Sequence, residues 1–121
     1  MSIIVDRFEK IKLNIAKSNA NIIAVSKTFD FNHIKPLIDH GHLDFGENKV
    51  QEAESKWAEF KHSNSKLKLH MIGKLQTNKV KKAVQIFDYI HSLDNQKLAD
   101  TLKKNELQLN KNIKYFIQVN V

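Results

Sequence analysis

One strand followed by one helix is predicted by residues 22–41, IIAVSKTFDFNHIKPLIDHG. The apolar run at residues 22–25 has the length of a buried strand. Helical spacing returns directly after it, and the helix that this spacing predicts ends at Gly41. The apolar positions of that helix are Phe31, Ile34, Leu37 and Ile38. This strand and helix form the unit from which we expect the fold to be built.

The same unit recurs along the rest of the chain. Further strands are predicted at residues 43–45, 67–72 and 89–93, and each is followed by a segment with helical spacing. Residues 113–121 alternate apolar and polar side chains and predict a fifth strand. Strand starts are separated by roughly twenty to twenty-five residues, the spacing of consecutive βα units with short loops. The sheet is therefore predicted to be parallel.

Two parallel folds are compatible with five such units. An open doubly wound sheet would place a glycine-rich phosphate loop after the first strand, where this chain has Ser26-Lys27-Thr28. A (β/α)₈ TIM-type barrel needs no such loop and is favoured. A closed barrel takes eight strands and typically about 250 residues, so this chain would supply about the first five strands.

Composition fits one globular domain. We expect a single partial βα-barrel domain over residues 1–121, with an amphipathic helix at 3–18 and βα units from residue 22. The chain has no cysteine, which excludes disulfides and is typical of a cytoplasmic protein. Charged residues interrupt the N-terminus where a signal peptide needs an apolar core, and no apolar stretch approaches membrane-spanning length. No membrane partner is expected.

The chain is basic, with a formal net charge of +7. Such a balance raises the possibility of an RNA-binding module. Arg7 is the only arginine, however, and the lysines are scattered from Lys10 to Lys114. Proteins recognise bases and phosphates mainly through the planar group of arginine, which can form two hydrogen bonds at once. We therefore interpret the lysines as a solvated basic surface and do not expect a nucleic-acid partner.

Polar residues follow four of the predicted strands. Their carboxyl ends share one mouth in a parallel barrel, so side chains just beyond these ends are expected to gather there. These positions are Lys27, Glu47 and Asn48, Gly73 to Gln76, and Asp94.

Lys27 is the most informative of them, because its side chain could react with an aldehyde. An amine attacks an aldehyde only in its neutral form, and apolar Val25 and Phe29 would desolvate the ammonium form of Lys27. On this evidence alone, a surface lysine is the simpler interpretation. Asn48 is equally suited to hydrogen-bond a cofactor ring and to cap the following helix.

Other polar residues have simpler interpretations. His70 is predicted to point inward and to bond a backbone carbonyl. Thr77 or Asn78 is predicted to cap the next helix, whose start could bind an anion. His91 and Asp94 indicate strand polarity and a cap, and the histidines lack the spacing of metal ligands, so no metal is expected.

Three segments, taken in order, resemble the N-terminal signatures of the pyridoxal-phosphate homeostasis family. They are IIAVSKT at 22–28, DFGENKVQEA at 44–53 and LHMIGKLQTNK at 69–79. The resemblance covers about the first half of the family's usual length. It implies a barrel like that of the alanine racemase N-terminal domain, with pyridoxal 5'-phosphate as cofactor.

The resemblance also implies roles for two residues. Lys27 corresponds to the lysine that holds the cofactor as a Schiff base, and Asn48 to a residue beside it. Phe29-Asp30 replaces a basic residue and a proline that are frequent in the family. The family's phosphate-binding loops follow later strands.

The function that the resemblance implies is pyridoxal 5'-phosphate homeostasis without a reaction of its own. Its expected partners are the cofactor, pyridoxal-phosphate-dependent apo-enzymes, and a second copy of the chain at an open strand edge. An amino-acid racemase or decarboxylase is the alternative, although it needs acid and base partners that the sequence does not show.

Overall fold

The computed structural model describes residues 2–27 and 29–119. Thr28, in the first family signature, and Val121, in the predicted fifth strand, lie outside the described residues. The strands are β1 (Ala24–Val25), β2 (Asp44–Glu47), β3 (Lys68–Met71), β4 (Tyr89–Leu93) and β5 (Lys114–Ile117). The helices are α1 (Ile3–Asn14), α2 (Phe31–Asp39), α3 (Val50–Ser63), the 3₁₀ turn η1 (Thr77–Lys79), α4 (Val80–Ile86) and α5 (Gln96–Leu109).

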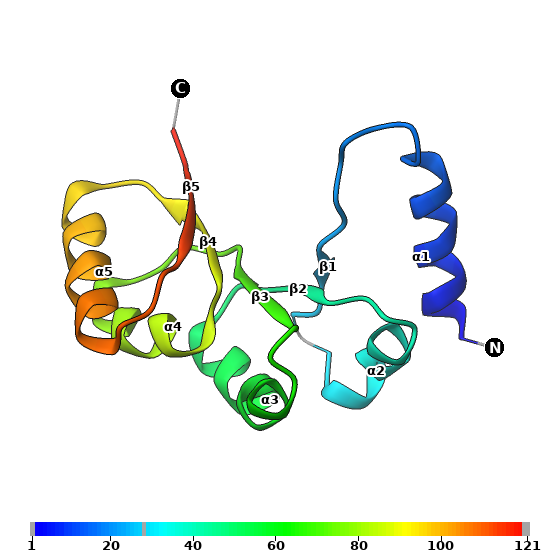
Figure 1. The fold of residues 1–121 in the computed structure, drawn as a ribbon, viewed down its shortest axis with the longest axis horizontal. Coiled ribbons are helices and arrows are strands. Elements are labelled where there is room, and N and C mark those ends of the chain that lie inside the picture. The colour runs from blue at the N-terminus through cyan, green and yellow to red at the C-terminus, as the bar shows by residue number, and fades with distance from the viewer. Residues whose placement is uncertain (1, 28, 120–121) are drawn as a thin grey trace.

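All five strands form one parallel sheet in the order β1-β2-β3-β4-β5. Figure 1 shows this sheet as a curved array with α2 to α5 along its outer side and α1 beyond β1. A doubly wound sheet would reverse its strand order and carry helices on both faces. The observed order never reverses, so the predicted barrel-type fold is confirmed for the part of a barrel present here.

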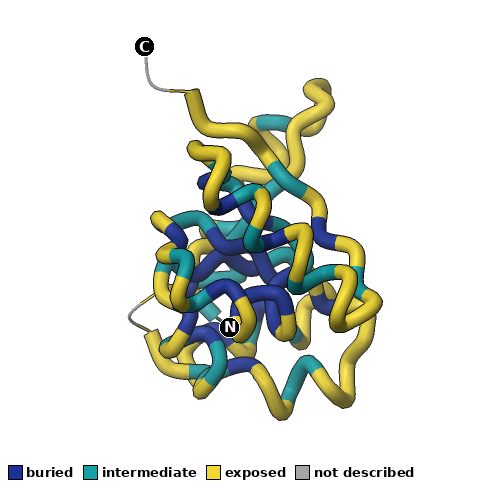
Figure 2. The backbone as a smooth tube through the Cα atoms, turned by 90° about the vertical axis from the view of Figure 1, so that its left-hand side faces the viewer, coloured by how far each residue is buried: buried dark blue, intermediate teal, exposed yellow. Residues whose placement is uncertain are grey.

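The core lies between the sheet and its outer helices. Successive side chains of a strand point to opposite faces. Phe45 and Leu69 are fully buried on the helix side, where Trp57 of α3 packs against Phe45 with a ring-centroid distance of 5.0 Å. Figure 2 shows the buried backbone gathered in the middle of the molecule, while the C-terminal segment is exposed.

Local capping explains where several helices begin and end. Asp30 caps α2 by accepting a hydrogen bond from the His33 amide at 2.9 Å, and Asn95 caps α5 at Leu98 in the same way. The first helix is shorter than predicted, since α1 ends at Asn14 instead of residue 18. After the helix, the amide and the hydroxyl of Ser18 both donate to the carbonyl of Ile15, at 2.9 and 2.8 Å.

Two described strands lie at the edges of the sheet, β1 and β5. Around β5 the apolar side chains of Phe116, Ile117 and Val119 are 54%, 74% and 72% exposed. Within the described residues, no helix combines the length and apolar character that a bilayer crossing requires.

Candidate functional site

Parallel pairing brings the carboxyl ends of β1, β2 and β3 side by side. The Ser26 amide donates to the Gly46 carbonyl at 3.0 Å, and the Ile72 amide donates to the Glu47 carbonyl at 3.0 Å. These bonds continue the ladder past the strand ends. Lys27, Asn48 and Gly73 therefore lie together beyond the carboxyl ends of these strands, as predicted from their positions after successive strands.

Asn48 and Gly73 are in close contact. A Cβ atom at Gly73 would lie 2.5 Å from the backbone oxygen of Asn48 and 2.7 Å from its Cβ. Only glycine permits the loop after β3 to approach Asn48 this closely. The N-cap position of α3 is occupied by Lys49, so of the two alternatives left open for Asn48, the helix cap is not found.

The primary amine of Lys27 is accessible at these strand ends. The residue is exposed, and Val25 and Phe29 are each about half exposed. Phe29 stacks on His33 at 4.4 Å. The expected desolvation of Lys27 by these apolar neighbours is therefore not found, because all three side chains remain open to solvent.

A cavity of about 410 Å³ adjoins Asn48 between the loops that follow β2 and β3. Its lining includes three lysines, Lys49, Lys74 and Lys79, and no acidic residue. The helix cap predicted at Thr77 or Asn78 is wrong, because Thr77–Lys79 form the turn η1 and no side chain caps α4. The positive charge beside Asn48 is thus supplied by lysine side chains.

Glu47 does not reach the mouth, contrary to its predicted place there. Its side chain is fully buried on the helix side. There Glu47 Oε2 accepts hydrogen bonds from Ser26 Oγ at 2.5 Å, Lys56 Nζ at 2.9 Å and Trp57 Nε1 at 2.8 Å. The alternation of side chains along a strand predicts this burial, since Glu47 lies two residues after buried Phe45 and points to the same face of the sheet.

The ion pair of Glu47 with Lys56 is almost fully shielded, with side chains 0% and 7% exposed. Removing one partner of such a pair leaves an uncompensated charge and typically costs about 3–5 kcal/mol. The sequence motifs did not single out Lys56. Its role depends on a contact with Ser26 across thirty positions, which the sequence did not reveal.

A second polar network crosses the inner face of the sheet. His70 Nε2 lies 2.9 Å from Asp44 Oδ1, and His70 Nδ1 lies 2.9 Å from His91 Nε2. Because an ionised carboxylate only accepts, His70 Nε2 donates and a neutral His70 accepts from His91. The predicted backbone partner of His70 is wrong, since these side chains from β2 and β4 hold it.

Aromatic rings cover the two histidines of this network. His70 stacks on Tyr89 at 4.3 Å and His91 stacks on Phe116 at 4.5 Å. Burial, and to a lesser degree the charge of His70, lower the pKa of His91. No three His, Asp or Glu side chains in the described part of the chain are arranged to hold a metal ion.

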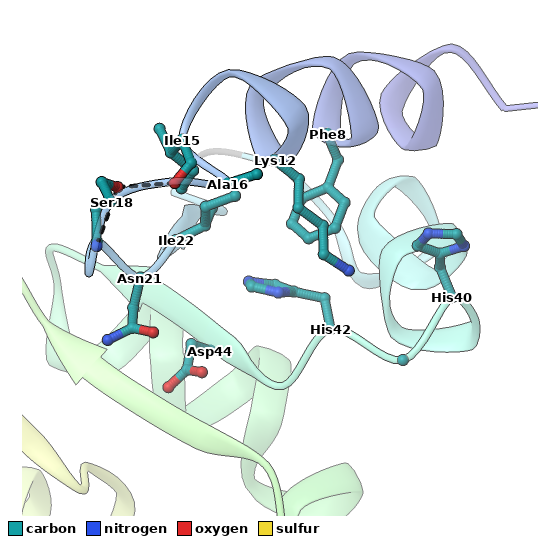
Figure 3. A pocket seen from close by; sticks show the side chains of 12 residues that line it. Phe8, Lys12, Ile15, Ala16, Ser18, Asn21, Ile22, His40, His42 and Asp44 are labelled. Carbon is teal, nitrogen blue, oxygen red and sulfur yellow. Dashed lines mark hydrogen bonds between the residues drawn. The ribbon is translucent and has the colours of Figure 1, made fainter.

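Another cavity, of about 350 Å³, lies at the opposite ends of the strands. Figure 3 shows the His42 ring between Phe8 and Lys12 of α1 and the start of β2 at Asp44. This cavity lies at the amino ends of the strands, whereas Lys27 and Asn48 lie beyond their carboxyl ends. It is therefore separate from the candidate site.

Comparisons with known proteins identify relatives of this chain. No protein-family model matches the chain. It is 37% identical over 105 residues to the pyridoxal phosphate homeostasis protein of Pasteurella multocida and 38% identical over 99 residues to that of Buchnera aphidicola. The matches cover 87% and 82% of this chain but 45% and 49% of the relatives. The chain spans about half the length of the curated relatives it matches.

Solved structures lead to the same result. PipY of Synechococcus elongatus PCC7942 matches this chain with a TM-score of 0.80 and 38% identity, both without pyridoxal phosphate and with it bound. The match covers 92% of this chain and 53% or 54% of PipY. The predicted resemblance is confirmed: the chain is similar in sequence to about half of the pyridoxal phosphate homeostasis proteins and in fold to about half of PipY, which fits the predicted N-terminal half.

Proposed function

We propose that this chain binds pyridoxal 5'-phosphate in cofactor homeostasis and holds it as a Schiff base on Lys27. The observation that carries the proposal is the convergence of Lys27, Asn48 and Gly73 on neighbouring strand ends. The relatives' names and the PipY structure with pyridoxal phosphate bound support the choice of cofactor.

The residues present fit this cofactor. Pyridoxal phosphate supplies an aldehyde, which a primary amine converts to a C=N bond with loss of one water molecule. Lys27 provides an exposed amine at the strand end. Asn48, pressed against Gly73, provides an amide that can donate to or accept from a ring substituent.

We assign no reaction of its own to this site. Its role would be to hold a reactive aldehyde and release it to pyridoxal-phosphate-dependent apo-enzymes. The network of His70, Asp44 and His91 lies on the inner face of the strands, and both ring nitrogens of His70 are already bonded within it.

The first test is to trap the bound cofactor with borohydride and map the modified peptides by mass spectrometry. We expect the reduced adduct mainly on Lys27, and its near-complete loss in Lys27→Ala. Lys74→Ala is the matched control, because Lys74 is another exposed lysine beside Asn48. An adduct found mainly on Lys74 or Lys79 would show that the assignment is wrong.

A further inference from the structure

Ser26, the residue before Lys27, is held by a buried group of polar side chains. We call Glu47, Lys56 and their bonds to Ser26 the Ser26 clamp. Ser26 and Glu47 are fully buried, and the Lys56 side chain is 7% exposed. The clamp joins the end of β1 to β2 and to the middle of α3.

Every polar group of Ser26 is bonded. Its amide donates to Gly46, and its hydroxyl donates to Glu47 Oε2 at 2.5 Å. Its carbonyl accepts from Lys56 Nζ at 2.5 Å and from the Phe29 amide at 3.3 Å. The Ser26 carbonyl is thus bonded both by α3 and by Phe29, which follows Lys27 in the chain.

Stability alone does not account for a charged pair at this place. Well-packed apolar side chains in place of a buried ion pair are often equally stable or more so. Here both charges converge on one residue, and Lys56 bonds the Ser26 carbonyl, which adjoins Lys27. The neighbouring Trp57 closes the group by donating to the same carboxylate oxygen.

We infer that Lys56 and Glu47 are positioning residues that fix the backbone at Ser26, beside which Lys27 reacts with an aldehyde. This inference rests on the proposed function. Lysine has a long flexible side chain, so a fixed backbone under it reduces the range of places that its amine visits. Small displacements of a reacting group change rates strongly, and a shift of 1 Å costs up to roughly a hundredfold.

The main variant is the double substitution Glu47→Gln with Lys56→Met, which removes both buried charges; Glu52, which Lys56 also contacts at 3.4 Å, has a side chain that is 30% exposed to water. Lys82→Met is the matched control, because Lys82 forms an exposed ion pair with Glu54 at 3.8 Å on the outer helices. Pyridoxal phosphate is added with cyanoborohydride, and the labelling rates of Lys27 and exposed Lys97 are measured by peptide mass spectrometry.

We expect the Lys27 rate to fall about tenfold in the double variant, while the Lys97 rate stays unchanged and Lys82→Met has no effect. Hydrogen exchange of the Phe29 amide should become faster at the same time. A purely structural role would instead leave the ratio of Lys27 to Lys97 labelling unchanged.

Ser26→Ala keeps the test decisive if the double variant unfolds, which faster labelling of partly buried Lys61 would reveal. This change deletes only the hydroxyl bond and leaves Glu47 bonded to Lys56 and Trp57. We expect it to lower the Lys27 rate about threefold. An unchanged Lys27 rate in the folded variants overturns this inference alone. Absence of Lys27 labelling in the unmodified chain overturns the proposed function and this inference with it.

Discussion

Gly73 shows how a single residue shapes the site. Its missing side chain is what allows the loops after β2 and β3 to meet at Asn48. Lys27, by contrast, has an exposed side chain and follows Ser26, whose polar groups are all bonded. Under the proposed function, Gly73 would contribute by leaving space and Lys27 by presenting an amine.

Replacing Gly73 by alanine should therefore destabilise the chain. The added Cβ would lie 2.5 Å from a backbone oxygen, which cannot move aside as a side chain can. We expect a loss of about 1–3 kcal/mol in the free energy of unfolding, the usual cost of overpacking, measured by urea denaturation.

Gly46→Ala is the matched control for this prediction. There the new Cβ would meet only side-chain atoms of Ile23 and Ile72, at 3.2 and 3.3 Å. Its cost should be smaller. Equal costs for the two substitutions would contradict the importance of the contact between Gly73 and Asn48.

Helix α1 and strand β2 meet at His42, whose protonation is expected to affect their packing. The His42 ring lies 4.7 Å from that of Phe8 and 5.3 Å from that of Phe45. Burial lowers the pKa of His42, while Asp44 partly opposes this shift. The Nε2 atom of His42 is buried and has no hydrogen-bond partner.

Stability should therefore fall as the pH is lowered through the ordinary pKa of histidine, 6.5. A lowered pKa means that the folded state binds fewer protons than the unfolded state, so the stabilisation is complete above that pH and is lost below it. His91, with its lowered pKa, contributes in the same direction. Urea unfolding at pH 7.5 and pH 5.5 measures the effect.

His42→Phe provides the comparison, because phenylalanine keeps the ring contacts and cannot be protonated. The variant should lose less stability than the unmodified chain between the two pH values. The same loss in both proteins would show that His42 does not cause the pH dependence.

As a whole, the molecule is a sheet with helices on one side and an open inner face (Figure 1). Exposed apolar side chains near β5 accompany an unpaired strand edge. Unpaired edges with apolar side chains favour association of chains. This geometry gives physical support to the predicted self-association.

The chain in solution is expected to have a light-scattering mass above its own 14.0 kDa. Ile117→Lys should shift it toward monomer by placing a charge at the edge strand. Leu107→Lys is the control, since Leu107 is equally exposed, at 74%, but lies on α5. A compact monomer with cooperative unfolding in the unmodified chain would contradict this prediction.

The last prediction concerns the two ends of the cofactor, the aldehyde with its ring and the phosphate. The family resemblance places the phosphate-binding loops after later strands, whereas under the proposed function Lys27 and Asn48 would contact the aldehyde and the ring. Each charge-assisted hydrogen bond to phosphate is worth about 1.5–3 kcal/mol. This chain should prefer pyridoxal phosphate to 5-deoxypyridoxal, a phosphate-free aldehyde that cannot cyclise, by less than about a hundredfold, roughly 2.7 kcal/mol.

Absorbance titration with both aldehydes measures this preference, with Lys27→Ala as the blank. A larger preference would contradict the division and would direct attention to the cavity lined by Lys49, Lys74 and Lys79. Lys74→Ala and Lys79→Ala would then show whether these lysines bind the phosphate.

Sequence periodicity was sufficient to predict the order of strands and helices, because each element is specified by neighbouring residues. It also placed Lys27, Asn48 and Gly73 at one mouth, since parallel strands of known order must end there together. Helix ends were predicted less well. The first helix, α1, ends at Asn14, four residues before its predicted end.

The partners of buried polar groups were decided by tertiary structure alone. Glu47 and Asn48 are adjacent in sequence, yet the alternation of the strand sends Glu47 to the helices while Asn48 stays at the mouth. His70 bonds side chains from two other strands, and Lys56 reaches Ser26 from α3. Local patterns predict which residues are buried, but a hydrogen-bond partner is chosen by distance in the folded chain.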